Sequence, residues 1–215
     1  MKTLALGIAA VVVSAAGTAH AGVLTQADLA EGVSYQELAI DGVTVTVTTD
    51  DGVTKRKTVN GVTGVGVSGG TVNGEIDTRE ALNFDFASPL AVDEITIAFL
   101  YDNGQFGDHP AEVADFVTDL GTYTLQVTGP TTATWSGGGM VENMSIATEA
   151  GGGAWTLSGD LFGGAISKLS LVSGNPGSQA TYADFSFVSL NAVPTPGAAA
   201  LLGLGGLALA RRRRA

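Results

Sequence analysis

Residues 43–67 read VTVTVTTDDGVTKRKTVNGVTGVGV, and this stretch decides the fold class. Valine and threonine alternate with a period of two over Val43–Thr48, which places the valines on the buried face of a β-strand and the threonines on its other face. Asp50-Asp51-Gly52 and Asn60-Gly61 are tight-turn sequences, because aspartate, asparagine and glycine tolerate positive φ. The stretch therefore predicts a three-stranded antiparallel meander.

Short alternating segments of this kind recur along the rest of the chain, separated by turns rich in glycine, asparagine and aspartate. Further strands are predicted at 34–38, 82–86, 95–99, 123–127, 140–146, 155–157, 166–172 and 182–190, with a break at Pro89. About eleven short strands within residues 22–192 predict an all-β domain, an antiparallel two-sheet sandwich of jelly-roll-like form.

One segment has helical periodicity instead. Pro110 suits a first helical turn, and the apolar residues that follow it fall at i, i+3, i+4 and i+7. These residues are Val113, Phe116, Val117 and Leu120. The pattern predicts a helix over Asp108–Leu120, with a loop followed by an edge strand as the alternative.

The N-terminus has the three parts of a secretory signal peptide. Met1-Lys2 supplies a positive charge, Leu4–Ala16 is apolar, and Ala19-His20-Ala21 is a small-x-small cleavage site before Gly22. Residues 1–21 are therefore predicted to form a signal helix that signal peptidase removes after Ala21. Signal peptidase and the export machinery are therefore predicted partners, and the body is predicted to lie outside the inner membrane.

A continuous apolar run lies near the C-terminus. Gly197–Ala210 contains only glycine, alanine and leucine, and Arg211, Arg212, Arg213 and Arg214 follow at once. A helix over about 196–210 would rise roughly 21 Å against a hydrocarbon core of roughly 30 Å, which predicts a short single transmembrane helix helped by snorkelling arginines. The arginines predict a cytoplasmic C-terminus. A buried core helix is the alternative interpretation.

The order of elements in this tail resembles a known sorting signal. Pro194-Thr195-Pro196-Gly197, the apolar run and the terminal arginines make residues 193–215 similar to the PEP-CTERM signal of exported bacterial proteins. The resemblance implies recognition by an exosortase-type membrane transpeptidase, removal of the tail, and delivery to the cell surface or extracellular matrix. The family has glutamate where this chain has Thr195, and retention of the tail as an inner-membrane anchor is the alternative.

Part of the body also resembles domains that precede this signal. Gly64–Val67, Glu75–Asp77 and Glu80–Phe86 have the look of uncharacterised surface β-sandwiches. That resemblance implies a sandwich and no known chemistry.

Composition excludes several classes of function. The body carries all 21 acidic side chains but only five basic ones, a net charge of about −16, which disfavours nucleic acid as a partner and permits divalent cations. The chain has no cysteine, so disulfides, structural cysteine–zinc sites and thiol catalysis are excluded. The basic Lys55-Arg56-Lys57 triplet is interpreted as charge on an edge strand.

Calcium is the one cofactor that the sequence suggests. Carboxylate and amide oxygens gather within eleven residues, on a loop whose glycines let the backbone curl around a hard cation. The predicted ligands are Asp102, Asn103, Asp108 and Glu112. The cluster of Glu75, Asp77 and Glu80 is a second candidate, and ordinary turn capping is the alternative for both groups.

Two tryptophans and one histidine are the candidates for carbohydrate binding and catalysis. Trp135 and Trp155 would stack on sugars, such as those of an exopolysaccharide, if they stood exposed, and would otherwise be core residues. His109 is the only histidine outside the signal peptide, and no Gly-x-Ser-x-Gly motif accompanies it. We assign no catalytic residue.

Together these features predict an exported, non-enzymatic cell-surface or matrix protein that acts by adhesion or structural association. A carbohydrate- or calcium-dependent binding module is the first alternative. A glycoside hydrolase, which needs two carboxylates at the right separation in space, is the second.

Overall fold

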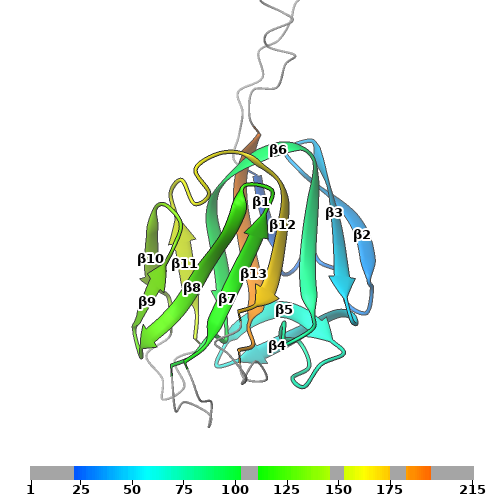
Figure 1. The fold of residues 1–215 in the computed structure, drawn as a ribbon. Helices are drawn as coiled ribbons and strands as arrows, with labels where there is room; N and C mark the ends of the chain where they lie inside the picture. Colours follow the sequence, from blue (N-terminus) through cyan, green and yellow to red (C-terminus); the bar gives the residue numbers. More distant parts are fainter. Residues whose placement is uncertain (1–21, 103–110, 146–152, 175–182, 195–215) are drawn as a thin grey trace, which may run out of the picture. The chain divides into compact units, whose positions relative to one another are not determined.

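The computed structural model describes residues 22–102, 111–145, 153–174 and 183–194, which contain strands, turns and loops and no helix (Figure 1). The strands are β1 (Gly22–Thr25), β2 (Tyr35–Ile40), β3 (Val43–Asp50), β4 (Val53–Val59), β5 (Val62–Ser68), β6 (Ala81–Ala98), β7 (Val113–Thr118), β8 (Gly121–Gly129), β9 (Thr132–Trp135), β10 (Met140–Asn143), β11 (Trp155–Ser158), β12 (Ile166–Ser173) and β13 (Ser186–Pro194). They form one curled 13-stranded sheet whose pairs are antiparallel. The all-β prediction is confirmed.

β6 is the strand around which the sheet curls. Its first half, Ala81–Phe86, pairs with β3 and β12, whereas its second half, Leu90–Ala98, pairs mainly with β13 and β11. The strand changes neighbours at Ala87–Pro89, where all three side chains are exposed. Proline has no N–H to donate, so it is tolerated at such a point. The predicted break at Pro89 is wrong, because the same strand continues through it.

The predicted meander is correct at its second turn. Asn60 and Gly61, with φ of 51° and 82°, join β4 to β5 and place Val59 opposite Val62. Both residues have the positive φ that a two-residue hairpin turn requires. This hairpin is therefore confirmed.

The first turn of the meander is wrong. β3 does not pair with β4, because it lies between β2 and β6. Its hairpin partner is β2, through a turn at Asp41 and Gly42 with φ of 47° and 80°. The chain leaves β3 through Asp51, at φ 56°, and crosses to another part of the sheet. Alternation along β3 fixes which side chains are buried but not which strand lies beside it.

The helix predicted over Asp108–Leu120 is also wrong where it can be compared. Val113–Thr118 is β7, and it lies between β12 and β8, so it is not an edge strand either. Val113, Ala114 and Phe116 are buried and Val117 is exposed. A strand flanked on both sides can bury adjacent residues, which mimics helical spacing over a short window. Residues 108–110 lie outside the described part.

The core inside the curl contains several large aromatic side chains among aliphatic ones. Fully buried examples are Phe84, Phe116, Trp155, Phe185 and Phe187. The rings of Phe84 in β6 and Phe187 in β13 lie 5.1 Å apart between centroids. Burying a phenylalanine stabilises a fold by about 1.5–3 kcal/mol relative to exposure. The two halves of β6 thus contribute to a common core.

The two ends of the described body are neighbours. β1 pairs with the last residues of β13, with Gly22 opposite Ala192 (Figure 1). Pro194 lies opposite Leu90, next to the bend of β6, so this end of the sheet is opposite to Ala81. No helix with the length and hydropathy of a membrane span occurs in the described residues. The helices predicted over 1–21 and about 196–210 lie outside them.

Candidate functional site

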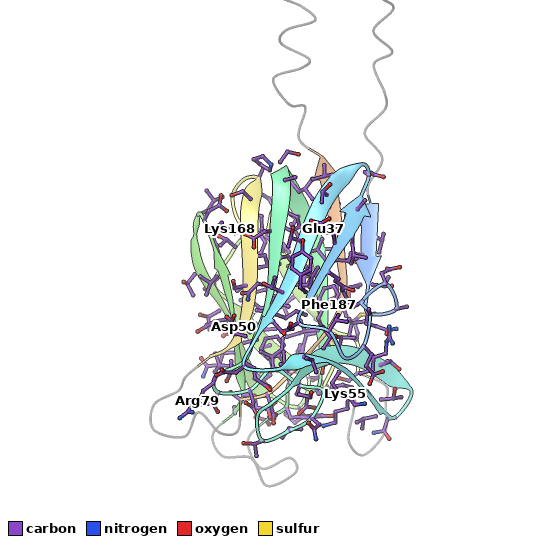
Figure 2. All side chains as sticks on the ribbon, turned by 90° about the vertical axis from the view of Figure 1, so that its right-hand side faces the viewer. Glu37, Asp50, Lys55, Arg79, Lys168 and Phe187 are labelled. Carbon is purple, nitrogen blue, oxygen red and sulfur yellow. The ribbon has the colours of Figure 1, made fainter. Side chains whose placement is uncertain are left out.

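An acidic hollow of about 530 Å³ lies on the described body. It lies where the chain leaves β3 and where it enters β6. Its lining residues are Asp51, Gly69, Gly70, Thr71, Asp77, Thr78, Arg79 and Glu80. Figure 2 shows Arg79 at the lower end of the body, whereas Glu37 and Lys168 lie farther up the strands. The hollow is therefore at the end of the sheet opposite to Gly22 and Pro194.

Two buried carboxylates build the wall of this hollow. Asp77 and Glu80 are only 3% and 2% exposed. Glu80 Oε1 accepts from the Gly70 N–H at 2.6 Å and Oε2 from the Asp77 N–H at 3.1 Å, and the Glu80 N–H donates to the Asp77 carbonyl at 2.8 Å. Asp77 Oδ2 accepts from the N–H groups of Thr71 and Val72. Both carboxylates therefore hold the backbone of the turn in place.

Burial and charge raise the pKa of Glu80. Desolvation is the largest cause and the nearby Asp77 charge acts in the same direction, while the hydrogen bonds from Asp77 and Gly70 oppose it. Gly70 is required here, because a Cβ on it would lie 2.0 Å from Asp77 Oδ1. The Asp77-x-x-Glu80 spacing of a capping box was a readable signal in the sequence, but only the bond from the Asp77 N–H to the Glu80 carboxylate is present, because Asp77 Oδ2 accepts from Thr71 and Val72.

Glu75 does not join this pair. It is buried, and its carboxylate forms an ion pair with Lys57 at 2.7 Å. Lys57 Nζ also lies 5.5 Å from the ring centroid of Phe99. No group of three or more acidic or histidine side chains in the described ranges has a metal-binding arrangement. The structure thus brings Asp77 and Glu80 together and gives Glu75 a different partner.

Of the other group of predicted calcium ligands, only Asp102 and Glu112 lie in the described residues. Glu112, 1% exposed, accepts a hydrogen bond from the Tyr101 N–H, and its own N–H donates to the Tyr101 carbonyl at 3.2 Å. These bonds hold Tyr101 and Glu112 together, and Asp102 is the residue that follows Tyr101. Asn103 and Asp108 lie outside the described residues, so calcium binding here stays a prediction.

Trp155 is a core residue. It is 1% exposed, and its Nε1 donates to the Leu100 carbonyl at 2.9 Å. Burial of both ring faces leaves no surface on which a sugar could stack. The carbohydrate hypothesis therefore depends on Trp135 alone.

Trp135 is half-buried, and other groups cover its ring. Tyr123 stacks on it at 5.9 Å between centroids, and Phe116 meets its edge at 5.1 Å. A Cβ on Gly137 would lie 2.7 Å from ring atoms, so the backbone of Gly137 contacts the indole. Trp135 Nε1 donates to the Gly138 carbonyl at 2.9 Å. This arrangement is that of edge packing.

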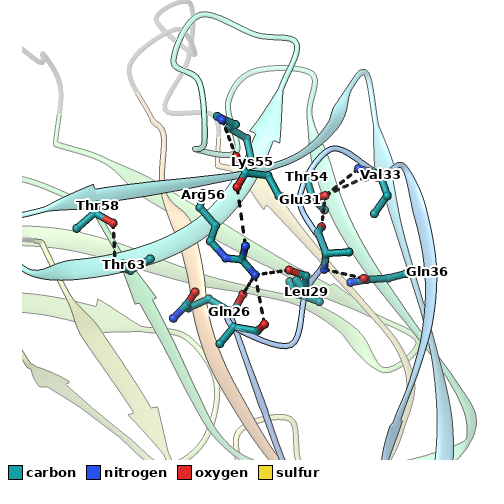
Figure 3. A network of polar contacts seen from close by, with 12 residues as sticks. Gln26, Leu29, Glu31, Val33, Gln36, Thr54, Lys55, Arg56, Thr58 and Thr63 are labelled. Atoms are coloured by element: carbon teal, nitrogen blue, oxygen red, sulfur yellow. Dashed lines mark hydrogen bonds and ion pairs between the residues drawn. The ribbon is translucent and has the colours of Figure 1, made fainter.

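The basic triplet is a structural tie. Arg56 Nη2 donates to the carbonyl oxygens of Gln26, Ala27 and Leu29 at 3.2, 3.2 and 2.5 Å (Figure 3). Lys55 pairs with Glu31, which belongs to the same segment. β4 is an edge strand, as interpreted, but these side chains fasten the segment after β1 to it.

The sorting and cleavage residues fall at the borders of the described body. Gly22 begins β1 and Pro194 ends β13. The remaining predicted residues lie outside the described ranges, namely Ala19, Ala21, Thr195, Pro196, Gly197, Arg211, Arg212, Arg213 and Arg214. Comparison of the chain with models of protein families, with curated proteins and with solved structures finds no match.

Proposed function

We propose that this protein is an exported, non-enzymatic cell-surface or extracellular-matrix protein that acts by adhesion or structural association. One observation carries the proposal. The two strands next to the predicted delivery segments, β1 and β13, are neighbours, and they end at one end of the sheet. The acidic hollow and the Tyr101–Glu112 base belong to the opposite end, which a tethered body would present to its surroundings.

The use of the buried acids supports a non-enzymatic role. Asp77 and Glu80 accept hydrogen bonds from backbone N–H groups, and Glu75 pairs with Lys57. Carboxylates engaged in this way are poorly suited to the acid–base steps of glycoside cleavage, which need one group protonated and one free to reach the sugar.

We also propose that the curled sheet is a two-layered, jelly-roll-like sandwich. The two halves of β6 pair with different sets of strands, which is what a strand shared between two layers would do. In this proposal the tail, residues 193–215, anchors the body in the inner membrane or is removed by an exosortase-type enzyme.

Selective labelling of intact cells tests the location of the body. The chain has no cysteine, so Arg79→Cys introduces a single thiol at an exposed position. We expect a membrane-impermeant maleimide to label it without lysis. Ser186→Cys, at a fully buried position, is the matched control and should react only after unfolding. Labelling of Arg79→Cys only after lysis would contradict exposure of the body at the cell surface.

Calcium-dependent binding is the second candidate function, favoured by the closure that Tyr101 and Glu112 make beside Asp102. Binding stabilises the folded state by mass action, so millimolar calcium should raise Tm by several degrees if the site is occupied. Asp102→Asn should abolish the shift, while Asp160→Asn, in another turn, should retain it. An unchanged Tm of the parent protein at millimolar calcium would remove this candidate.

A further inference from the structure

We propose that cleavage after Ala21 creates an ion pair between the new α-ammonium group of Gly22 and the carboxylate of Asp41, and that this pair locks β1 onto the sheet. The inference rests on the proposed function, because it requires export and cleavage at that bond. Hydrolysis of the Ala21–Gly22 peptide bond consumes one water, leaves the carboxylate on Ala21 and leaves the amine on Gly22. This amine takes up a proton at neutral pH, since an α-amino pKa is about 8.

The geometry places the new charge beside an acid. A Cβ on Gly22 would lie 3.3 Å from Asp41 Cγ and 3.2 Å from the Asp41 backbone nitrogen. By covalent geometry the Gly22 nitrogen is about 2.5 Å from that Cβ position, so it lies within about 6 Å of the carboxyl carbon. Opposite charges at roughly 4–6 Å favour each other's charged form. Before cleavage the same nitrogen is an uncharged amide.

The partner is held in a defined position. Asp41 and Gly42 form the two-residue turn between β2 and β3, with Ile40 opposite Val43. A Cβ on Gly22 would also meet Ile40 Cγ2 at 2.3 Å, so only glycine lets the first residue approach this turn. Among the described residues, the ion pairs formed by lysine and arginine do not involve Asp41.

The lock acts on β1, which pairs with β13, the strand that continues into the tail. β1 is four residues long and takes part in a ladder only with β13, whose final residue is Pro194. A strand this short frays easily, because few hydrogen bonds resist its opening. Signal-peptide removal would therefore complete the pairing of β1 beside the point where the sheet joins the predicted anchor.

Hydrogen exchange of the full chain tests the lock. The exported protein is purified and its N-terminus is determined by intact mass. A second form carries one extra alanine ahead of Gly22, which moves the ammonium about 3.4 Å along the strand direction. Asp41→Asn is made in both forms. Asp51→Asn is the matched control, because Asp51 also has positive φ in a turn but lines the distant hollow.

The expected result is specific to one N-terminus. In the form that begins at Gly22, Asp41→Asn should speed amide exchange across Val23–Thr25 about two- to five-fold, the scale of an exposed ion pair. In the extended form the same substitution should have no effect, and Asp51→Asn should act equally in both forms. An equal effect of Asp41→Asn in both forms, or no effect in the Gly22 form, would overturn the inference.

Intact mass distinguishes failure of the export proposal from failure of the ion pair. If intact mass shows that the bond after Ala21 is not cut in the cell, the export proposal fails at that bond. The Gly22 form is then produced with a designed protease site, and the exchange experiment still decides whether the ion pair forms.

Discussion

Glu80 shows how single residues in this protein use charge to hold the backbone. Its carboxylate accepts from the N–H groups of Gly70 and Asp77, although burial raises its pKa. Burial of such a carboxylate costs desolvation free energy, and the hydrogen bonds that order the turn offset this cost. This balance has a measurable pH signature.

The raised pKa predicts the sign of the pH dependence. Between the ordinary value of 4.5 and the raised pKa, the folded state keeps a proton on Glu80 that the unfolded state has released. The Glu80 contribution to the free energy of unfolding should therefore fall as pH rises through this window. Glu80→Gln should remove that slope in denaturant unfolding measured from about pH 4 to about pH 7.

Asp28 provides the internal comparison. The Thr25 backbone N–H, and then the Thr25 hydroxyl, lower the pKa of Asp28 below 3.8. Its contribution is present above that value and is lost as pH falls through the lowered pKa, so it lies in a different window. A slope above pH 4.5 that persists unchanged in Glu80→Gln would show that another group is responsible.

Gly66 is a residue at which the packing leaves no room for a side chain. A Cβ on it would lie 2.4 Å from backbone atoms of Glu75, which cannot move independently of the fold. Gly66→Ala should therefore lower the free energy of unfolding by about 2 kcal/mol or more, as expected for overpacking. Gly164→Ala is the control, because its Cβ would meet only Leu120 Cδ1 at 3.5 Å. Equal Tm values for the two variants would contradict the packing described.

At the scale of elements, the segment between β1 and β2 depends on β4. Gly32 N–H donates to the Thr54 carbonyl at 2.8 Å and the Thr54 N–H donates to the Val33 carbonyl at 2.9 Å, so this segment covers the free edge of β4. Arg56 adds three carbonyl contacts (Figure 3). An otherwise exposed strand edge is thereby protected from pairing with other chains.

Arg56→Lys should weaken this attachment although the charge is retained. A lysine ammonium cannot reproduce the planar fork of the guanidinium, so we expect a loss of about 1–2 kcal/mol in the free energy of unfolding. Lys55→Gln, which removes an exposed ion pair with Glu31, should lower the free energy of unfolding less than Arg56→Lys does. Hydrogen exchange across 26–33 should rise in the arginine variant and remain near normal in the lysine variant. The reverse order would contradict the assigned roles.

The sequence predicted where the strands occur better than it predicted which strands pair with each other. Alternation found β3, β5, β8 and β12, because one buried face imposes a period of two. It missed β1 and β9, and it assigned β7 to a helix. It could not show that β3 pairs with β6 and not with β4, since pairing depends on contacts distant in sequence.

The candidate site was predicted only in part, for the same reason. Asp77 and Glu80 were selected as acids, but their engagement with the N–H groups of Gly70 and Thr71 depends on how the turn folds back. Trp155 could be core or surface on sequence alone, and its burial follows from the pairing of β11 with the second half of β6. Residue types indicate candidate chemistry, whereas the fold determines which groups are available.

At the scale of the whole molecule, the described body is an acidic sheet whose first strand starts at Gly22 and whose last strand ends at Pro194. Gly22 follows the predicted signal-peptide cleavage site, and Pro194 is the first residue of the predicted sorting motif. Since β1 and β13 are neighbours, both delivery segments join the body at one end. The proposed export, anchoring and N-terminal lock all depend on this arrangement.

Intact mass of the protein recovered from fractionated cells tests the central proposal most directly. We expect a chain that begins at Gly22, found in the membrane or extracellular fraction, with the tail either present through Ala215 or removed near Pro194–Gly197. A chain that retains Met1 and is recovered from the soluble cytosolic fraction would contradict it.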